Sequence, residues 1–290
     1  MKAHLVYSDS YNISVPGLDW LHVFDGRKFG RAWDLLAGEF GPALNDVRIT
    51  PEREVNTEEL LTVHTPEYLE SLSSSSVIAQ ALEVGPIRWL PTSFVDTHLL
   101  RPMRYAAYGT VVAADAAVEP SIAVNLGGGF HHAFASRGEG FCIYADVAMA
   151  IQLMRRRGAI GPHDPIWVID LDAHRGNGIE DIFGHDENVH FFDIYNFQIY
   201  PGPPSGPEKA EPPFLIPVKS RCSEEFYLTT LHRELDQFLE SAPSPKLAFY
   251  NAGTDVVDGD PLGRLKVSED GVFERDRYVI DSLRSEEFRR

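Results

Sequence analysis

Cysteine is scarce in this sequence. Only Cys142 and Cys222 occur among the 290 residues, which excludes a disulfide framework. The N-terminus, MKAHLVYSDS, lacks the long apolar region of a signal peptide. No apolar run approaches the roughly 20 residues that a membrane-spanning helix needs. We therefore expect a protein of the reducing cytoplasm with no membrane partner.

Basic residues are also few. The chain has 26 lysines and arginines against 43 acidic residues, which gives a formal net charge of -17. This balance argues against direct binding of nucleic acid, which would require a basic patch. An acidic surface suits a cationic substrate or simply keeps a protein in solution, and both explanations stay open.

The remaining composition is that of a globular protein, with 43% hydrophobic and 24% charged residues. Short apolar runs alternate with segments of helical periodicity. This alternation predicts one α/β domain over residues 1–290, with a mostly parallel sheet sandwiched by helices. The candidate strands are Ala3–Tyr7, Ser121–Leu126, Ile166–Asp170, Val189–Ile194 and Leu247–Tyr250. The candidate helices are Gly30–Phe40, Thr57–Val63, Pro66–Ser73, Leu99–Val118, Ala145–Arg157, Gly178–Phe183, Glu224–Ser241 and Val272–Arg284.

Two local features add to this picture. Asn56 or Thr57 is expected to cap the helix that carries Glu58 and Glu59 in its first turn. Residues 201–213, PGPPSGPEKAEPP, are too rich in proline and glycine for a helix or a central strand. They predict one long ordered loop.

Polar residues follow three of the candidate strands. GGGFHH follows the strand at 121–126, LDAHRGNG follows 166–170, and NAGTD follows 247–250. In parallel sheets, ligands bind beyond the carboxyl ends of the strands. The three segments therefore bring histidines, aspartates and glycines to one edge of the expected sheet.

Asp172 and His174 form a candidate metal-binding pair. Residues i and i+2 of an extended chain point to the same side, so the two side chains could hold one cation. Asp255, from another strand end, could supply a third ligand. Three protein ligands and one open position are typical of catalytic zinc. The alternative is that Asp172 and His174 only cap the helix that follows.

His131 and His132 follow the triple glycine at a strand end, where one of them could act as a general base. The alternative is a pair of ordinary surface or core histidines. Asp170 and Asn177 flank the Asp-x-His pair and are candidates to orient an imidazole. Cys142 is expected to be a small packed residue. Phosphate-loop and nucleophile-elbow motifs are absent from the sequence.

Together these segments resemble the histone deacetylase family of zinc-dependent amidohydrolases, within the arginase/deacetylase fold. The resemblance lies in residues 127–151, 168–183, 199–202 and 250–265, and it extends over nearly the whole chain. Further stretches resemble the class IV branch of the family: residues 6–30, 58–72 and 99–105, and the runs AHRGNG and NAGTD.

The resemblance implies a zinc ion held by Asp172, His174 and Asp255. Asp170, Asp172 and His174 also match residues near a structural monovalent cation such as K⁺. Three further residues match those that form the walls of the acyl-lysine tunnel in the family: Gly140, Phe141 and Tyr200.

The resemblance also assigns the proton-transfer groups. His131 and His132 match the tandem histidines, with His132 as the general base and acid. Asp170 matches the carboxylate behind His131, and Asn177 stands where class I enzymes carry a second carboxylate. Because an amide orients a ring without stabilising its cation, we expect His132 to be less basic than its class I counterparts.

One departure from the family concerns a tyrosine that contacts the substrate carbonyl. Family members continue past the helix after the third aspartate with another strand and a glycine-rich turn ending in that tyrosine. Here the only tyrosine beyond Asp255 is Tyr278, inside a helical pattern, and the role is not transferred to it. We expect a C-terminally incomplete domain that lacks the last strand and helix. A natural variant completed by a partner and a binding-only relative stay open.

The expected reaction is zinc-dependent hydrolysis of an N-acyl-lysine amide in a peptide or protein. Class IV relatives suggest long-chain acyl groups as well as acetyl. The first alternative is a small-molecule deacetylase that acts on acylated amines such as acetylpolyamines. The second is a catalytically impaired protein that binds acyl-lysine without turnover.

Overall fold

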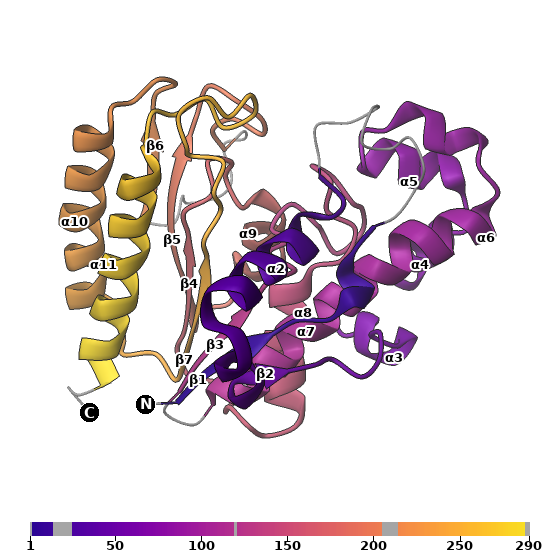
Figure 1. Ribbon diagram of the computed structural model, residues 1–290, viewed down its shortest axis with the longest axis horizontal. Coiled ribbons are helices and arrows are strands. Elements are labelled where there is room, and N and C mark those ends of the chain that lie inside the picture. The colour runs from indigo at the N-terminus through magenta and orange to yellow at the C-terminus, as the bar shows by residue number, and fades with distance from the viewer. Residues whose placement is uncertain (1, 14–24, 119–120, 205–213, 288–290) are drawn as a thin grey trace. The chain divides into compact units, whose positions relative to one another are not determined.

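The computed structural model describes residues 2–13, 25–118, 121–204 and 214–287. It divides into two compact units, Met1–Gly161 and Pro162–Arg290, each built from parallel strands and helices (Figure 1). The α/β class with parallel sheets flanked by helices is thus confirmed. Of the loop expected at 201–213, residues 205–213 lie outside the described residues, as do residues 14–24 of the class IV-like stretch at 6–30.

The N-terminal unit contains a three-stranded sheet of order β2-β1-β3. Its strands are β1 (Lys2–Val6), β2 (Arg48–Ile49) and β3 (Ser121–Asn125). Its α-helices are α2 (Lys28–Phe40), α3 (Thr57–Leu60), α4 (Pro66–Ser71), α5 (Ser75–Ala81), α6 (Thr92–Val95), α7 (Arg101–Ala117) and α8 (Asp146–Arg156). Shorter helical turns are η1 (Asp9–Tyr11), η2 (Gly41–Asp46), η3 (Gly85–Trp89) and the π-turn η4 (Asp96–Leu100).

The C-terminal unit contains a four-stranded parallel sheet of order β6-β5-β4-β7. Its strands are β4 (Ile166–Asp170), β5 (Val189–Asn196), β6 (Leu215–Val218) and β7 (Leu247–Asn251). Its helices are α9 (Asn177–Phe183), α10 (Glu224–Ser241) and α11 (Glu269–Glu287). In Figure 1, α10 and α11 run side by side along this sheet.

The core of the C-terminal unit lies between the sheet and these two helices. Trp167 and Phe192 from the strands pack with Tyr227 and Phe238 of α10, and all four side chains are almost fully buried. Every residue of β4 is buried, as expected for a central parallel strand with an apolar run. This burial fixes the register of β4, and the register determines which residues leave the sheet together at its carboxyl end.

Several boundaries differ from the sequence prediction. The helix expected at 57–63 ends at Leu60 and continues as turns, and the helix expected at 99–118 begins as a π-turn before α7. Strands β2 and β6 were not predicted, because a two-residue strand and the short run around Pro217 carry little periodicity. None of the described helices combines the length and the hydropathy needed to cross a membrane.

Candidate metal centre

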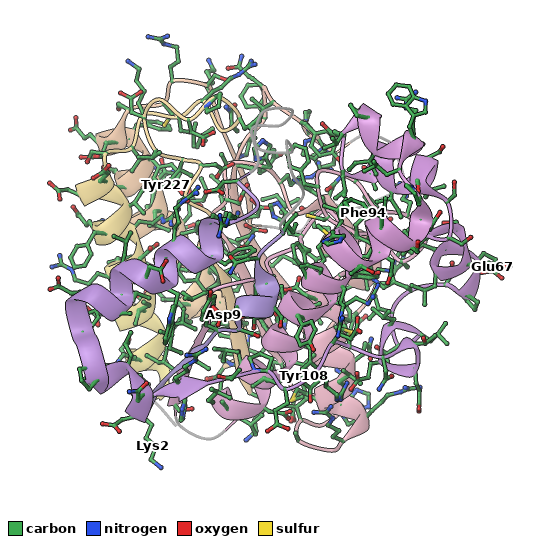
Figure 2. The ribbon with its side chains drawn as sticks, turned by 45° about the vertical axis from the view of Figure 1, so that its right-hand side comes forward. Lys2, Asp9, Glu67, Phe94, Tyr108 and Tyr227 are labelled. Atoms are coloured by element: carbon green, nitrogen blue, oxygen red, sulfur yellow. The ribbon has the colours of Figure 1, made fainter. Side chains whose placement is uncertain are left out.

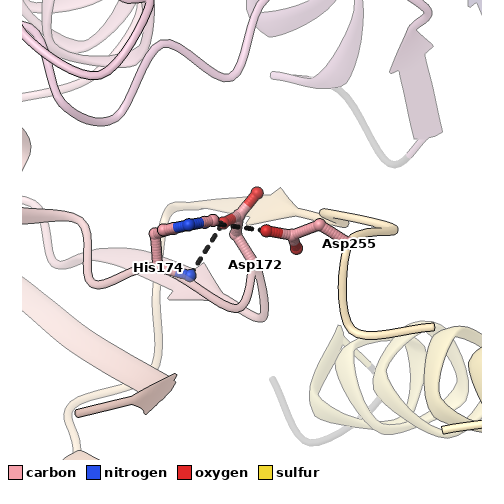
Figure 3. A group of neighbouring side chains, drawn as sticks. All are labelled: Asp172, His174 and Asp255. Carbon is pink, nitrogen blue, oxygen red and sulfur yellow. Dashed lines mark hydrogen bonds and ion pairs between the residues drawn. The ribbon is translucent and has the colours of Figure 1, made fainter. Parts of the chain in front are cut away.

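Two neighbouring strands build the metal-ligating group. Strand β4 pairs in parallel with β7, and Asp170 at the end of β4 lies opposite Asn251 at the end of β7. The loops that follow therefore leave the sheet at the same level. They bring Asp172, His174 and Asp255 together, with one ligand atom of each within 4.8 Å of the others (Figure 3).

The imidazole of His174 lies between the two carboxylates. Its Nδ1 is 3.0 Å from Asp172 Oδ1 and 2.7 Å from Asp255 Oδ2. The Ala173 N–H donates to Asp255 Oδ1 at 2.8 Å, so the first loop orients the ligand of the second. Asp172 and His174 thus point to the same side, as their spacing predicts, and their side chains face that of Asp255.

The contact between the two loops depends on Gly253. A Cβ on this residue would lie 2.4 Å from Asp172 Oδ2 and 2.5 Å from Asp172 Cα. Only glycine lets the two backbones approach this closely. The glycine in NAGTD is therefore a structural requirement of the ligand group.

The electrostatics of the group favour a bound cation. Burial lowers the pKa of His174, but the hydrogen bonds and charges of Asp172 and Asp255 outweigh it and raise the pKa to about 10. Burial and the charge of Asp172 raise the pKa of Asp255 to about 6, against the opposing effect of His174. Without a metal, a proton is thus held among the three ligands.

The donor set fits zinc. One imidazole nitrogen and two carboxylate oxygens converge, and both are ligand types that zinc takes. Three protein ligands with one position left open is the form of a catalytic zinc site. Metal binding to such ligands displaces the proton that they share.

A second group of buried acids lies beside the metal ligands. Asp193 of β5 is opposite Asp170 of β4 and is 3% exposed. Asp193 Oδ2 accepts the Gly176 N–H at 2.9 Å, whereas its Oδ1 has no hydrogen-bond partner among the described residues. Burial, Asp170 and Glu180 raise the pKa of Asp193. The sequence analysis did not single out Asp193, although an acidic residue inside an apolar strand is a detectable signal.

Asp170 and Asn177 lie in the same unit as the metal group. Asp170 is buried, and its Oδ1 accepts bonds from Asn251 Nδ2 at 3.0 Å and from the Asp172 N–H at 3.1 Å. Asn177 is the first residue of α9. Tyr200, expected in the acyl-lysine tunnel, follows β5 and is 41% exposed.

The remaining predicted residues lie in the N-terminal unit. His131 and His132 are both buried, with ring centroids 4.0 Å apart. Gly140 packs on His132, because a Cβ there would lie 2.4 Å from His132 Cδ2. Phe141 follows with a positive φ of 66°. The structure thus brings the predicted base, His132, next to the loop predicted to form a tunnel wall.

A buried carboxylate holds the turn that carries the histidines. Asp146, the first residue of α8, accepts the Gly129 N–H at 2.9 Å and the Phe130 N–H at 2.8 Å. The Thr110 hydroxyl donates to the same carboxylate at 2.6 Å. Gly128 has a φ of 90°, and a Cβ there would lie 2.4 Å from Asp146 Oδ2. Sequence reasoning missed Asp146, because nothing local distinguishes it from an ordinary first-turn aspartate.

Two other expectations concern single side chains. Cys142 is buried and its Sγ donates to the Gly140 carbonyl at 3.3 Å, which agrees with a packed residue. Tyr278 lies on α11, and its hydroxyl donates to Asp236 of α10 at 2.5 Å. Tyr278 thus links the two helices of the C-terminal unit.

Comparison with known proteins identifies the family. Parallel α/β units with an Asp-His-Asp group at the strand ends define a candidate metallohydrolase, and the histone deacetylase domain model matches residues 22–287. The chain therefore belongs to the histone deacetylase family and carries its deacetylase domain.

Individual relatives agree with this identification. The chain is 40% identical to histone deacetylase 2 of Arabidopsis thaliana over 282 residues, which cover 96% of this chain and 70% of the relative. It is 29% identical to the acetoin utilization protein AcuC of Bacillus subtilis, over 91% of this chain and 68% of that protein. A crystal structure of an HDAC homologue from Aquifex aeolicus has the same fold, with a TM-score of 0.74 and 21% identity over 98% of this chain and 77% of that one.

Proposed function

We propose that this chain hydrolyses N-acyl-lysine amides and that it depends on zinc held by Asp172, His174 and Asp255. The observation that carries the proposal is the convergence of these three ligand atoms within 4.8 Å, in a chain of a deacetylase family. When bound, zinc supplies Lewis acidity that activates water and polarises an amide carbonyl.

The tandem histidines are the proposed proton-transfer groups. His132 takes a proton from water and later gives one to the leaving amine, assisted by His131. Both imidazoles are buried, and Asp146 fixes the turn before them. Gly140, packed on His132, and Phe141 are proposed to guide the acyl-lysine side chain, together with Tyr200. Asp170 and Asn177 are proposed to orient the histidines.

A monovalent cation such as K⁺ is a second proposed cofactor. The buried carboxylate of Asp193 and its strand neighbour Asp170 form an acidic pair, and Asp193 Oδ1 lacks a protein donor among the described residues. These residues fit a cation that takes oxygen ligands. We expect a higher melting temperature in potassium chloride than in an equal concentration of choline chloride, and identical melting in the two salts would contradict the proposal.

The decisive experiment is hydrolysis of matched acetyl-lysine and myristoyl-lysine peptides by the chain after chelation and after restoration of zinc. An N-acetylated polyamine provides the comparison for a small-molecule substrate. Peptide hydrolysis that disappears on chelation and returns with zinc supports the proposal, and the rate ratio identifies the acyl class. Faster hydrolysis of the acetylated polyamine than of the peptides would mean that the substrate is a small acylated amine instead of an acyl-lysine peptide. If the folded, zinc-loaded chain binds acyl-lysine but does not hydrolyse it, the protein binds this group without being an enzyme for it.

The role of His132 has its own test. We expect His132→Gln to lower hydrolysis by about 10²–10⁴-fold, the usual contribution of a general acid-base, while zinc content is unchanged. The exposed His163 allows the matched control His163→Gln. Equal activity of the two variants would remove His132 from the mechanism.

A further inference from the structure

The C-terminal unit contains a fully buried arginine that the proposed reaction does not use. Arg275 lies on α11 with 0% of its surface exposed. Arginine is rarely this buried unless its guanidinium has strong partners. Its neighbours include Tyr227 of α10, which is labelled in Figure 2 and is also fully buried.

The guanidinium joins the two loops that carry the metal ligands. Its Nη1 donates to the Leu171 carbonyl at 2.9 Å and to the Gly253 carbonyl at 2.6 Å. Leu171 directly precedes Asp172, and Gly253 lies two residues before Asp255. One nitrogen therefore links the backbone beside the first ligand to the backbone beside the last.

A second set of contacts orients the guanidinium. Arg275 Nε donates to Asp276 Oδ1 at 2.8 Å, and the Tyr250 hydroxyl donates to the same oxygen at 2.5 Å. Tyr250 belongs to β7, so the sheet itself holds the acceptor in place. Lysine could not reproduce this arrangement, because only a guanidinium offers several donors in one rigid plane.

The position of Arg275 affects the metal ligands because the two loops that carry them are in close contact. Gly253 already lies in close contact with Asp172, and the Ala173 N–H bonds to Asp255. A small shift of either loop would move Asp255 away from His174. The affinity of a site for its metal depends on the groups that hold the ligands in the right orientation.

We propose that Arg275 is a positioning residue for the metal group: it ties the Leu171 and Gly253 carbonyls together and thereby sets the spacing of Asp172, His174 and Asp255. The proposal rests on the zinc site of the proposed function. A merely structural role would instead make Arg275 matter for the stability of the metal-free chain and not for its affinity for zinc.

The test compares Arg275→Lys with Arg277→Lys, the same change at an exposed position two residues along the same helix. Zinc affinity is measured by competition with a chromogenic chelator, and thermal unfolding is measured on the metal-free proteins. We expect Arg275→Lys to weaken zinc binding about 10–100-fold, as outer-layer changes at metal sites do. We also expect an altered visible spectrum when cobalt replaces zinc, while Arg277→Lys resembles the wild type.

A folded Arg275→Lys variant with wild-type zinc affinity would overturn the inference and leave the proposed function intact. A wild-type chain without zinc affinity would overturn both. If Arg275→Lys does not fold, Asp276→Ala decides, because it removes the acceptor of Arg275 Nε and leaves the arginine in place. We expect Asp276→Ala to weaken zinc binding in the same direction, and unchanged affinity in that variant would overturn the inference.

Discussion

Each unit of the molecule contains buried carboxylates close to a strand end, but the two environments differ. In the N-terminal unit, Asp146 receives hydrogen bonds from the Thr110 hydroxyl and from the N–H groups of Gly129 and Phe130. It also lies in the first turn of α8, where the helix dipole favours a negative charge. Its donors come entirely from the protein.

In the C-terminal unit, Asp172 and Asp255 share a single imidazole, that of His174. Asp193 and Asp170 add further acidic groups on adjacent strands. The nearby guanidinium of Arg275 donates to carbonyl oxygens and to Asp276 instead of these acids. Acidic side chains are thus gathered around one imidazole at this site, an arrangement that a bound cation would stabilise.

The comparison shows what distinguishes a structural acid from a functional one. Burial alone does not, because Asp146 and Asp193 are both buried. The difference lies in the groups around each carboxylate. Asp146, which accepts bonds from backbone N–H groups and a neighbouring hydroxyl, stabilises a turn. Acids that gather around one imidazole can instead bind a metal ion. Four experiments test this difference.

The largest expected effect follows from Asp172→Ala in the C-terminal unit. We expect loss of stoichiometric zinc, with affinity falling by more than the roughly 100-fold that outer-layer changes cost, and loss of hydrolysis. The change removes a charge that repels Asp255 but also a charge that attracts His174. Because these two effects oppose each other, the metal-free variant should unfold at about the same temperature as the wild type. Zinc content by elemental analysis and thermal unfolding provide both measurements.

The matched control is Asp258→Ala, an exposed aspartate three residues after Asp255. It should retain zinc and activity. If Asp172→Ala retained both as well, the ligand assignment would be wrong. If it lost zinc but also destabilised the metal-free chain strongly, the acid would be structural and the contrast with Asp146 would disappear.

The second experiment changes the N-terminal acid. Burial raises the pKa of Asp146, and the hydrogen bonds from Thr110, Phe130 and Gly129 act against this. Asp146→Asn replaces one acceptor oxygen with an NH₂ group that faces donors, so we expect about 3 kcal/mol lower stability in urea unfolding. Thr110→Val removes one donor and leaves the backbone bonds, so we expect a loss of about 1 kcal/mol. Zinc content should be unchanged in both, and zinc loss in either would contradict the comparison.

The sequence allowed the metal group to be predicted because the signal is local. Strands β4 and β7 end at Asp170 and Asn251, and parallel strands bring their carboxyl ends to one edge of the sheet. The Asp-x-His spacing then follows from the alternation of an extended chain. A cap at Asn56 or Thr57 was predicted for the same reason, and in the structure Asn56 is the cap and forms a capping box with Glu59.

The residues that hold the site could not be predicted, because their partners are distant in the chain. Asp146 binds backbone groups 16 and 17 residues away, and Arg275 contacts a carbonyl 104 residues away. In the sequence both are ordinary charged helix residues. Asp193 differs in part, because an acid inside an apolar strand is visible in the sequence, whereas its position opposite Asp170 is not.

The third experiment concerns a buried histidine that the N-terminal unit keeps neutral. His64 is 3% exposed, and its Nε2 accepts the Ala145 N–H at 3.0 Å, just before α8. Burial lowers its pKa from 6.5 to about 4, partly opposed by nearby backbone carbonyls. The unfolded chain therefore binds the proton more tightly, so the stability contribution is complete above the unfolded pKa and is lost as pH falls from 6.5 towards 4.

From pH 7 to pH 5 this residue should remove about 2 kcal/mol of stability. His64→Gln retains an acceptor for Ala145 but cannot be protonated, so its stability should depend less on pH over this interval. Urea unfolding with a chelator present keeps zinc binding out of the measurement, and the titration of Asp255 is common to the variant and the wild type. His185→Gln at an exposed position is the control. Equal pH dependence in His64→Gln and the wild type would contradict the assignment.

The smallest expected effect tests whether a helix cap in the N-terminal unit matters for stability alone. Asn56 Oδ1 accepts the Glu59 N–H at 2.9 Å, and the Glu59 carboxylate accepts the Asn56 N–H at 3.0 Å. Asn56→Ala removes the first bond at the start of α3, which should cost about 1 kcal/mol. The exposed Asn45 allows the matched control Asn45→Ala, which should cost less. Because both bonds join Asn56 only to Glu59 at the start of α3, zinc affinity and the rate per folded molecule should equal those of the wild type. A change in zinc affinity or in the rate would mean that polar groups outside the site also affect it. Hydrogen-bond partners alone would then not separate structural acids from metal ligands.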